Sequence, residues 1–467
     1  MKFIIVFLSL VIISCPTQSK NQKSIPKEQW MGIYLKQGKI GYSFSQIQRI
    51  KDYYKMTNRV KMNLAMMGQP EKIVSNFTGT TDTNFSLHSF EFSFQSQKNS
   101  FSARGSIKDN LFSIEVKSGG VVKKETREVN SENLYPVMTL GNVAIKRRFQ
   151  NGKEYIVKVF DATVLSVVDA KMTVLTKEQM LISGKNYNLT KLNVSMLGLT
   201  SVMWIDDDGI VRKQESPPAL TEVEETQEQA LSQEEAIGKL DILSLFSIPA
   251  DTIIPFPRKL RYLKLRLVNS DYSGFNLIDD RQTILIKKPL TIEIRSLDTL
   301  PNVALPIFSA DEFLKSSLCI QSDNAEIKKT AEKIVGKEKN GAKAVENITQ
   351  WVFGNVKKSA TASLPSAVDV LKNLEGDCNE HAVLFAALCR AAGVPAQICV
   401  GLVYVDGTFY YHAWNKVFLG RWVQVDPTFG QFPVDATHIK FTEGELEEQA
   451  KVLKIVGEIK IKILEFH

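Results

Sequence analysis

A helix-forming run with a cysteine at its start is the feature that most constrains the fold of this chain. Residues 379–392 are mostly helix formers such as Ala and Leu, and Gly393 with Pro395 ends the run as helices commonly end. Cys378 therefore lies at the N-terminus of a predicted helix. The positive end of the helix dipole stabilises a thiolate there, and unpaired backbone N–H groups can bind an oxyanion.

Three strand-like runs follow the helix, and their turns predict antiparallel pairing. Asp406-Gly407 is a strong hairpin dipeptide between the first two runs, and Gly420 lies in the turn between the second and the third. A hairpin about Gly420 brings His412 and Asp426 within a position or two of each other, where Cβ atoms lie roughly 5 Å apart. That spacing suits a histidine–carboxylate hydrogen bond. The runs are 396–404, 409–419 and 422–426.

Cys378, His412 and Asp426 supply, in this order, the residue types of a thiol-based catalytic site. A thiol nucleophile needs a base to take its proton, and the base needs a third group to fix its tautomer and orientation. Each residue alone has a simpler explanation, because a single Cys or His is usually a core residue and an Asp before Pro usually shapes a turn. The three together, on these elements, favour a catalytic triad.

Four short motifs surround these residues: Gly376-Asp377-Cys378 with Glu380, Arg390-Ala391-Ala392-Gly393-Val394-Pro395-Ala396, His412-Ala413-Trp414, and Trp422-Val423-Gln424-Val425-Asp426-Pro427-Thr428. They resemble the transglutaminase-like superfamily, and more closely its bacterial members, often called transglutaminase-like cysteine peptidases. The resemblance covers roughly residues 310–440. It implies a papain-like or transglutaminase-like core with Cys378 as nucleophile, His412 as general base and acid, and Asp426 as orienter. The papain pattern itself fits poorly, because its His follows the Cys by ~130–150 residues.

The resemblance also implies an upstream polar or aromatic side chain in the oxyanion hole. Trp351 and Asn373 are the upstream candidates for that role. Trp414, two residues after His412, is a further candidate for contact with the oxyanion or the substrate.

The N-terminus has the pattern of a bacterial lipoprotein signal. A basic start precedes an apolar run from Phe3 to Ile13, and Ser14-Cys15 follows it. The run is too short to span a bilayer as a helix. Residues 1–15 are therefore interpreted as a lipoprotein signal peptide with Cys15 as the lipidation site, and 16–27 as a polar tether. An ordinary signal peptide that happens to hold a cysteine is the alternative. The signal predicts a lipid-anchored protein of the bacterial cell envelope, periplasmic or surface-exposed.

Composition offers little support for other classes of function. A net charge of +7 over 467 residues is mild, and no basic cluster interleaves with aromatic residues, so no nucleic-acid partner is expected. No Gly-rich phosphate loop is present, and the sequence predicts no cofactor. The histidines outside the site are scattered, so no metal site is predicted. Cys389 and Cys399 are interpreted as core residues. The scattered histidines are His88, His381, His438 and His467.

The chain is predicted to have an α+β fold in several parts. Residues 28–214 alternate apolar and polar side chains and read as a large antiparallel sheet domain. The glutamate-rich segment 215–239 reads as a linker or short surface helix. Strand patterns return in 240–309 as a small β module, and 310–467 holds the catalytic core, with helices near 324–335 and 342–353.

The large sheet domain resembles, only loosely, the half-barrel lipid carriers of bacterial envelopes. Its apolar face is a core, a docking surface for a protein or a lipid site. Three classes of function then compete: a cysteine hydrolase or acyltransferase acting on peptide or protein amides, a non-enzymatic lipid- or protein-binding lipoprotein with a vestigial triad, and a strict cross-linking transglutaminase. Hydrolysis and transfer share one thioester intermediate, so the sequence leaves both open and favours hydrolysis.

Overall fold

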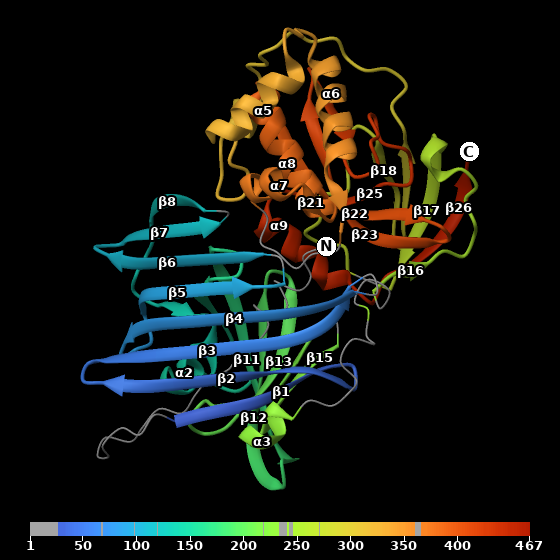
Figure 1. Ribbon diagram of the computed structural model, residues 1–467. Coiled ribbons are helices and arrows are strands. Elements are labelled where there is room, and N and C mark those ends of the chain that lie inside the picture. Colours follow the sequence, from blue (N-terminus) through green and yellow to red (C-terminus); the bar gives the residue numbers. More distant parts are fainter. Residues whose placement is uncertain are drawn as a thin grey trace. The chain divides into compact units, whose positions relative to one another are not determined.

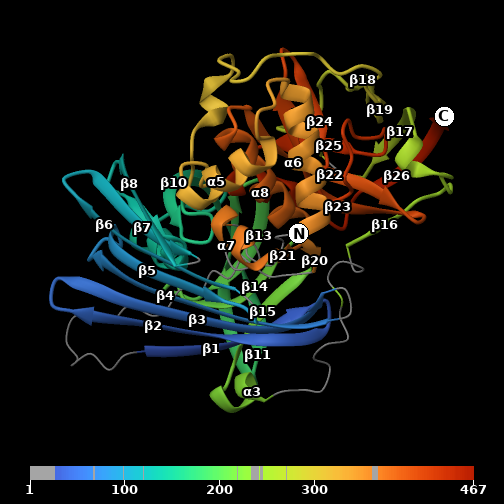
Figure 2. The same ribbon diagram turned by 45° about the horizontal axis from the view of Figure 1, so that its top comes forward.

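The computed structural model describes residues 27–66, 69–97, 99–118, 120–217, 219–232, 241, 246–269, 271–359 and 366–467. The predicted signal peptide, most of the tether and the lipidation site Cys15 lie outside these residues. The chain forms two compact units, one within residues 2–242 and the other within 243–467 (Figures 1 and 2). The first is almost entirely strand and the second mixes helices with sheets, so the α+β fold class is confirmed.

The N-terminal unit is one antiparallel sheet in which fifteen described strands pair in the order β8 to β1, then β15 down to β9. All neighbours are antiparallel except β9 and β10. The strands are β1 (Lys27–Leu35), β2 (Gly38–Ile50), β3 (Tyr53–Met66), β4 (Gln69–Asp82), β5 (Leu87–Gln95), β6 (Ser100–Lys108), β7 (Leu111–Ser118), β8 (Val121–Glu128), β9 (Leu134–Pro136), β10 (Glu154–Asp161), β11 (Ser166–Ile182), β12 (Lys185–Met196), β13 (Leu199–Ile205), β14 (Val211–Ser216) and β15 (Leu220–Glu225). Short helices are η1 (Val137–Thr139), α2 (Leu140–Lys146) and α3 (Gln227–Leu231).

Alternation of side chains along the strands places an aromatic core on one face of this sheet. Phe90 of β5 and Phe112 of β7 are buried, whereas Glu91 between the strand's phenylalanines is exposed. Both rings pack on Phe160 of β10, with centroids 4.5 and 4.9 Å away. Strands far apart in the sheet order therefore meet across one core, and Figure 1 shows the first strands lying across the later ones.

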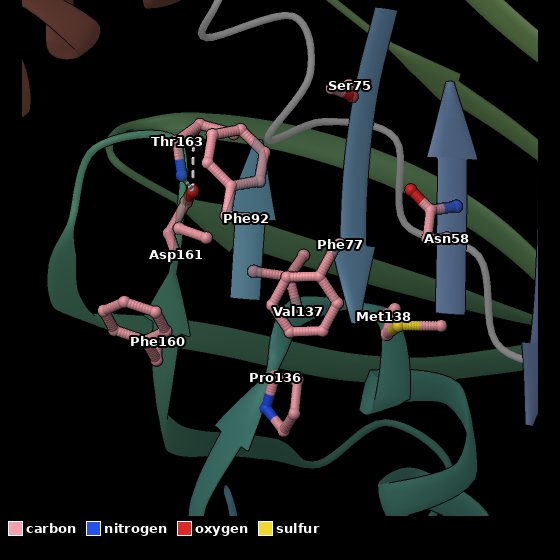
Figure 3. Close-up of a pocket in the computed structure, with 11 residues that line it drawn as sticks. Asn58, Ser75, Phe77, Phe92, Pro136, Val137, Met138, Phe160, Asp161 and Thr163 are labelled. Atoms are coloured by element: carbon pink, nitrogen blue, oxygen red, sulfur yellow. Dashed lines mark hydrogen bonds between the residues drawn. The ribbon is translucent and has the colours of Figure 1, made fainter. Parts of the chain in front are cut away.

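A small pocket opens at the edge of this core. Its volume is about 60 Å³, and Phe77, Phe92 and Phe160 lie around it (Figure 3). Asp161 also lines the pocket, and one of its carboxylate oxygens accepts hydrogen bonds from the backbone N–H and the hydroxyl of Thr163 at 2.8 and 2.6 Å. A lipid or protein ligand for this unit stays a prediction.

The acidic segment differs from its expected role as a linker. The sheet does not stop at the boundary predicted for 28–214, because Leu220–Glu225 form β15, which pairs with both β14 and β1. Strand pairing buries Leu220 and Glu222 in alternation despite the glutamate-rich composition. Residues 220–225 of this segment therefore form the strand that joins β14 to β1 in the middle of the sheet. Charge composition suggested solvation, but it says nothing about which backbone groups find partners.

The C-terminal unit surrounds one buried helix with sheets and helices. Helix α8 packs against β22 and β23 on one side and against α5, α6 and α7 on the other (Figure 1). The helices are η2 (Pro257–Lys259), η3 (Asp311–Leu314), α5 (Ala325–Val335), α6 (Gly341–Asn355), α7 (Ala367–Asn373), α8 (Cys378–Ala391), α9 (Leu446–Ala450) and η4 (Lys451–Ile455). The strands are β16 (Ile248–Pro249), β17 (Tyr262–Val268), β18 (Gln282–Lys287), β19 (Leu290–Arg295), β20 (Lys357–Lys358), β21 (Glu375–Gly376), β22 (Ala396–Val405), β23 (Thr408–Phe418), β24 (Trp422–Val425), β25 (Ile439–Glu443) and β26 (Lys460–Phe466).

The small β module predicted for 240–309 is not a separate body. Strand β26, at the C-terminal end of the described chain, pairs with β17, and β16 pairs with β23. Residues 243–467 are consequently one compact unit, and the predicted boundary at 310 does not divide it. The local strand pattern was read correctly. Pairing between strands almost two hundred residues apart cannot be inferred from alternation alone.

The local predictions around the helix and hairpin are confirmed. Helix α8 ends before Gly393, which has a φ of +80° as a left-handed stop requires. Asp406 and Gly407 have φ values of +45° and +84° and form the tight turn between β22 and β23. The helices predicted near 324–335 and 342–353 are α5 and α6. None of the helices within the described residues is long and apolar enough to cross a bilayer.

Candidate active site

The candidate nucleophile is the first residue of helix α8, and a capping box fixes that helix end. The Asp377 carboxylate accepts a hydrogen bond from the Asn379 backbone N–H at 2.8 Å, and the Glu380 carboxylate accepts one from the Asp377 N–H at 3.0 Å. Gly376 is required beside this box, because a Cβ there would lie 2.2 Å from the Glu380 Cβ. The motif Gly376-Asp377-Cys378 with Glu380 therefore builds the helix start that places the thiol.

His412 and Asp426 meet through the predicted hairpin of β23 and β24. Asn415 pairs with Val425 in the register, so Asp426 follows the paired strand at the level where His412 can reach it. The Nε2 atom of His412 donates to Asp426 Oδ2 at 2.7 Å. That bond leaves Nδ1 of the same ring for the thiol of Cys378, with which His412 is hydrogen-bonded. The structure thus brings the three predicted residues together.

Asp426 is fully buried, yet it is held as a carboxylate. Its Oδ1 accepts from the backbone N–H groups of Thr428 and Phe429 at 2.7 and 3.1 Å. Its Oδ2 accepts from His412 and, at 3.0 Å, from Nε2 of His438. Burial alone would raise the pKa of Asp426, but these donors and the charge of His412 hold that pKa well below its usual range.

The electrostatics favour a thiolate–imidazolium pair. Burial opposes the charge on Cys378, but His412 and the Ala413 N–H lower the pKa of this thiol below its ordinary value. Burial likewise opposes the charge on His412, but the charges of Asp426 and Cys378 raise the pKa of His412 to about 9. The proton therefore rests on the histidine, and the sulfur is ready to act as a nucleophile.

Residues 328–427, which include all three side chains, match the family model described as the Transglutaminase-like superfamily. The chain contains a transglutaminase-like domain.

Individual proteins also match part of this chain. Kyphoscoliosis peptidase of Mus musculus is 41% identical over 85 residues, which are 16% of this chain and 13% of that protein. An uncharacterized protein of Haemophilus influenzae is 34% identical over 96 residues, or 20% of this chain and 26% of that protein. The chain thus spans a small part of the length of these relatives. A candidate cysteine protease from Cytophaga hutchinsonii aligns with 44% of this chain and 86% of its own, at 19% identity and a TM-score of 0.28.

The other described cysteines differ from Cys378. All four described cysteines are free thiols. Cys319, Cys389 and Cys399 are buried, and burial raises the pKa of Cys389 and Cys399. Cys389 and Cys399 therefore have the environment of core residues, as predicted, and Cys378 is the one with a base beside it.

The predicted oxyanion candidates occupy three different settings. Trp414 is fully buried, and its indole N–H donates to Gln424 Oε1 at 2.8 Å, so its ring rather than its donor faces His412. Trp351 lies on α6, and Asn373 is exposed at the end of α7. In the described part of the chain no hydrogen bond or ring contact joins Trp351 or Asn373 to the triad. Their role stays a prediction, and the backbone N–H of Cys378 is the donor that the helix start provides.

His438 was missed by the sequence reasoning. The expectation that the remaining histidines are scattered is wrong for this residue, because β25 pairs with β22 and brings His438 against Asp426. His412, Asp426 and His438 are close enough that a metal ion could be considered. Their 2.7 and 3.0 Å separations are those of hydrogen bonds, shorter than the ~3.3 Å between two ligands of tetrahedral zinc. The arrangement fits a hydrogen-bonded triad better than a preformed metal site.

Proposed function

We propose that the transglutaminase-like domain is a cysteine hydrolase or acyltransferase acting on amide bonds of peptides or proteins. The observation that carries this proposal is the buried chain of hydrogen bonds from Cys378 through His412 to Asp426. The family match supports a cysteine-peptidase type of function. An orienting carboxylate, a base with a raised pKa and a thiol with a lowered one are the parts that such chemistry needs.

In the proposed reaction the Cys378 thiolate attacks the amide carbonyl carbon. The oxyanion that forms lies at the N-terminus of α8, where the Cys378 N–H can donate to it. The carbon–nitrogen bond breaks, and the His412 imidazolium gives its proton to the leaving amine. His412 then takes a proton from water or from an acceptor amine, which attacks the thioester and releases Cys378. Asp426 stays ionised throughout and holds the tautomer of His412.

Hydrolysis is the preferred outcome of the thioester, and the non-enzymatic alternative is disfavoured. The pKa of buried His412 is raised and that of buried Asp426 is lowered. Because strongly displaced pKa values cluster at functional sites, this favours a working triad over a vestigial one. Nothing in the sequence marks an acceptor channel for an amine, which favours water as the acceptor.

The test uses the purified full chain, a glutamine-donor protein and a fluorescent amine. Ammonia release without label uptake indicates hydrolysis of side-chain amides, uptake indicates transfer, and new amino termini indicate peptide-bond cleavage. We expect at least one of these signals in the wild type and none in Cys378→Ala. Cys389→Ala, which alters a buried thiol away from the triad, serves as the matched control and should keep the signal. Equal signals in wild type and Cys378→Ala would rule out this nucleophile.

We further propose that the protein is anchored in a bacterial envelope through a lipid on Cys15, which places its substrates there. The support is the basic start, the apolar run from Phe3 to Ile13 and the cysteine that follows Ser14. Cys15→Ser should abolish partitioning into detergent and release the protein from membranes. A Cys15→Ser variant that still fractionates with membranes would show that another anchor is present.

A further inference from the structure

His438 links the triad to a second buried carboxylate. Its ring is fully buried, with Nε2 lying 3.0 Å from Asp426 Oδ2 and Nδ1 lying 3.4 Å from Asp435 Oδ1. Ionised carboxylates only accept hydrogen bonds. Nε2 of His438 therefore donates to Asp426, and the ring lies between two carboxylates.

We propose that His438, anchored by Asp435, is a positioning residue that shares Asp426 with His412 and sets how strongly Asp426 stabilises the His412 imidazolium. The inference rests on the proposed function for its meaning. Its geometry does not depend on which substrate is used. Asp426 Oδ2 accepts hydrogen bonds from two imidazoles at once, at 2.7 and 3.0 Å. The position and charge of this one oxygen therefore couple the two rings.

Asp435 is itself firmly held, which makes it a fixed anchor for His438. Its Oδ1 accepts from the backbone N–H of Thr437 at 2.7 Å, and its Oδ2 accepts from Gln431 Nε2 at 2.9 Å. Arg258 lies 3.1 Å from the same Oδ2. Burial would raise the pKa of Asp435, but His438 and Arg258 keep that pKa below its usual range. A charged carboxylate thus faces the outer nitrogen of His438.

The groups around His438 define the sign of its effect on His412. The two imidazole rings have centroids 5.9 Å apart, and both rings face one carboxylate. The hydrogen bond from His438 helps keep Asp426 ionised and in place beside His412. Loss of this donor should therefore make His412 less basic, and a side chain that retains a donor should preserve its basicity. The charged and titratable groups near His438 in the described residues are Asp426, Asp435, His412, Arg258 and Arg281.

The test compares the pH dependence of Cys378 alkylation by iodoacetamide in three variants. His438→Gln keeps a hydrogen-bond donor, His438→Leu loses it, and Asp435→Asn loses the anchor. We expect His438→Leu to move the alkylation limb to higher pH by roughly one unit, because a less basic His412 favours the Cys378 thiolate less. Asp435→Asn should shift the limb in the same direction by less. His438→Gln should keep the limb near its wild-type position.

Asp279→Asn is the matched control. Asp279 is a largely buried carboxylate of the same unit that accepts from Gln424 at 2.7 Å and, within the described residues, contacts neither imidazole. Its alkylation limb should match that of the wild type. Near-ultraviolet circular dichroism reports folding of each variant. A folded His438→Leu with the wild-type limb would overturn the inference, as would the same limb in the Gln and Leu variants. Shifted limbs with no turnover in any variant would leave this inference standing and remove the proposed function.

Discussion

Asp426 in one unit of the molecule and Glu222 in the other are both almost completely buried, but their surroundings treat the two carboxyl groups in opposite ways. Asp426 of the transglutaminase-like domain accepts four hydrogen bonds, and its pKa is held low. Glu222 of the N-terminal sheet faces only the Ser43 hydroxyl, at 3.4 Å, and its Oε1 has no partner in the described residues. Burial raises the pKa of Glu222 to about 8, against a small opposing effect of Ser43.

The difference shows that donors rather than burial decide whether an interior carboxyl is charged. Burial alone makes the neutral acid the stable form, as at Glu222. A carboxylate kept charged at the same depth needs a dedicated set of donors, as at Asp426. Such a set orders several residues around one group, so a buried charge with many donors is a mark of function more than of stability.

The largest expected effect comes from Glu222→Gln, measured as the free energy of unfolding at pH 9. The folded pKa of Glu222, about 8, lies above its unfolded value of ~4.3, so the wild type loses stability as pH rises through this interval. The amide carries no such penalty. The variant should therefore be more stable than the wild type at pH 9 by roughly 2–5 kcal/mol, and the difference should shrink towards pH 4.

Hydrogen exchange of peptides from β15, measured at pH 5 and pH 9, locates this effect in the N-terminal unit. We expect the β15 peptides of Glu222→Gln to exchange more slowly than those of the wild type at pH 9 and at the same rate at pH 5. A gain of equal size at both pH values would show that the amide acts by packing and that Glu222 is not a neutral acid at neutral pH.

Asp426→Asn should have the next largest effect. The change keeps the size of the side chain but removes the charge that stabilises the His412 imidazolium, so turnover should fall by roughly 10- to 10³-fold. Alkylation of Cys378 should also require higher pH. Steady-state kinetics and alkylation on one preparation, with circular dichroism as the folding control, measure both. If Asp426 only shaped the turn into Pro427, both properties would stay at wild-type values.

The wild-type pH profile should show both members of the ion pair. Activity rises as Cys378 ionises, below the ordinary thiol pKa of ~8.5, and falls as the His412 imidazolium loses its proton near its pKa of about 9. In Asp426→Asn the falling limb should move to lower pH by a unit or more, because the carboxylate is the main source of the raised pKa. A falling limb that stays in place would remove Asp426 from this role.

Sequence reasoning succeeded where the site depends on neighbouring segments. The helix that starts at Cys378 and the hairpin that joins His412 to Asp426 are set by local signals: a capping box, a Gly stop and a turn of known register. These signals act over a few residues, and no distant partner is needed to interpret them. The resemblance to a family then implies roles for the same three residues, and these roles stay predictions.

The remainder depends on pairing between distant strands, which composition does not reveal. His438 reaches Asp426 because β25 pairs with β22. Strand β26 pairs with β17, which lies almost two hundred residues earlier in the chain. Glu222 lies in a glutamate-rich segment that looked solvated, yet β1 and β14 bury it as a strand. In each case the deciding interaction is the pairing of a strand with a distant partner strand, which the local sequence pattern does not identify.

The smallest expected effect tests the single donor of Glu222. Ser43→Ala removes the hydroxyl 3.4 Å from Glu222 Oε2, a long contact that favours the ionised form weakly. The variant should lose less than about 1 kcal/mol at pH 9, where Glu222 is charged, and almost nothing at pH 5, where it is neutral. Ser45→Ala is the matched control, because Ser45 is buried on the same strand and its hydroxyl has no partner in the described residues. Ser45→Ala should show no dependence on pH. Urea unfolding at the two pH values measures each difference. A pH-independent loss in Ser43→Ala would mean that the hydroxyl supports packing and not the charge. A loss at pH 9 much larger than about 1 kcal/mol would mean that one weak donor does the work of four, and the contrast between the two buried carboxyls would fail.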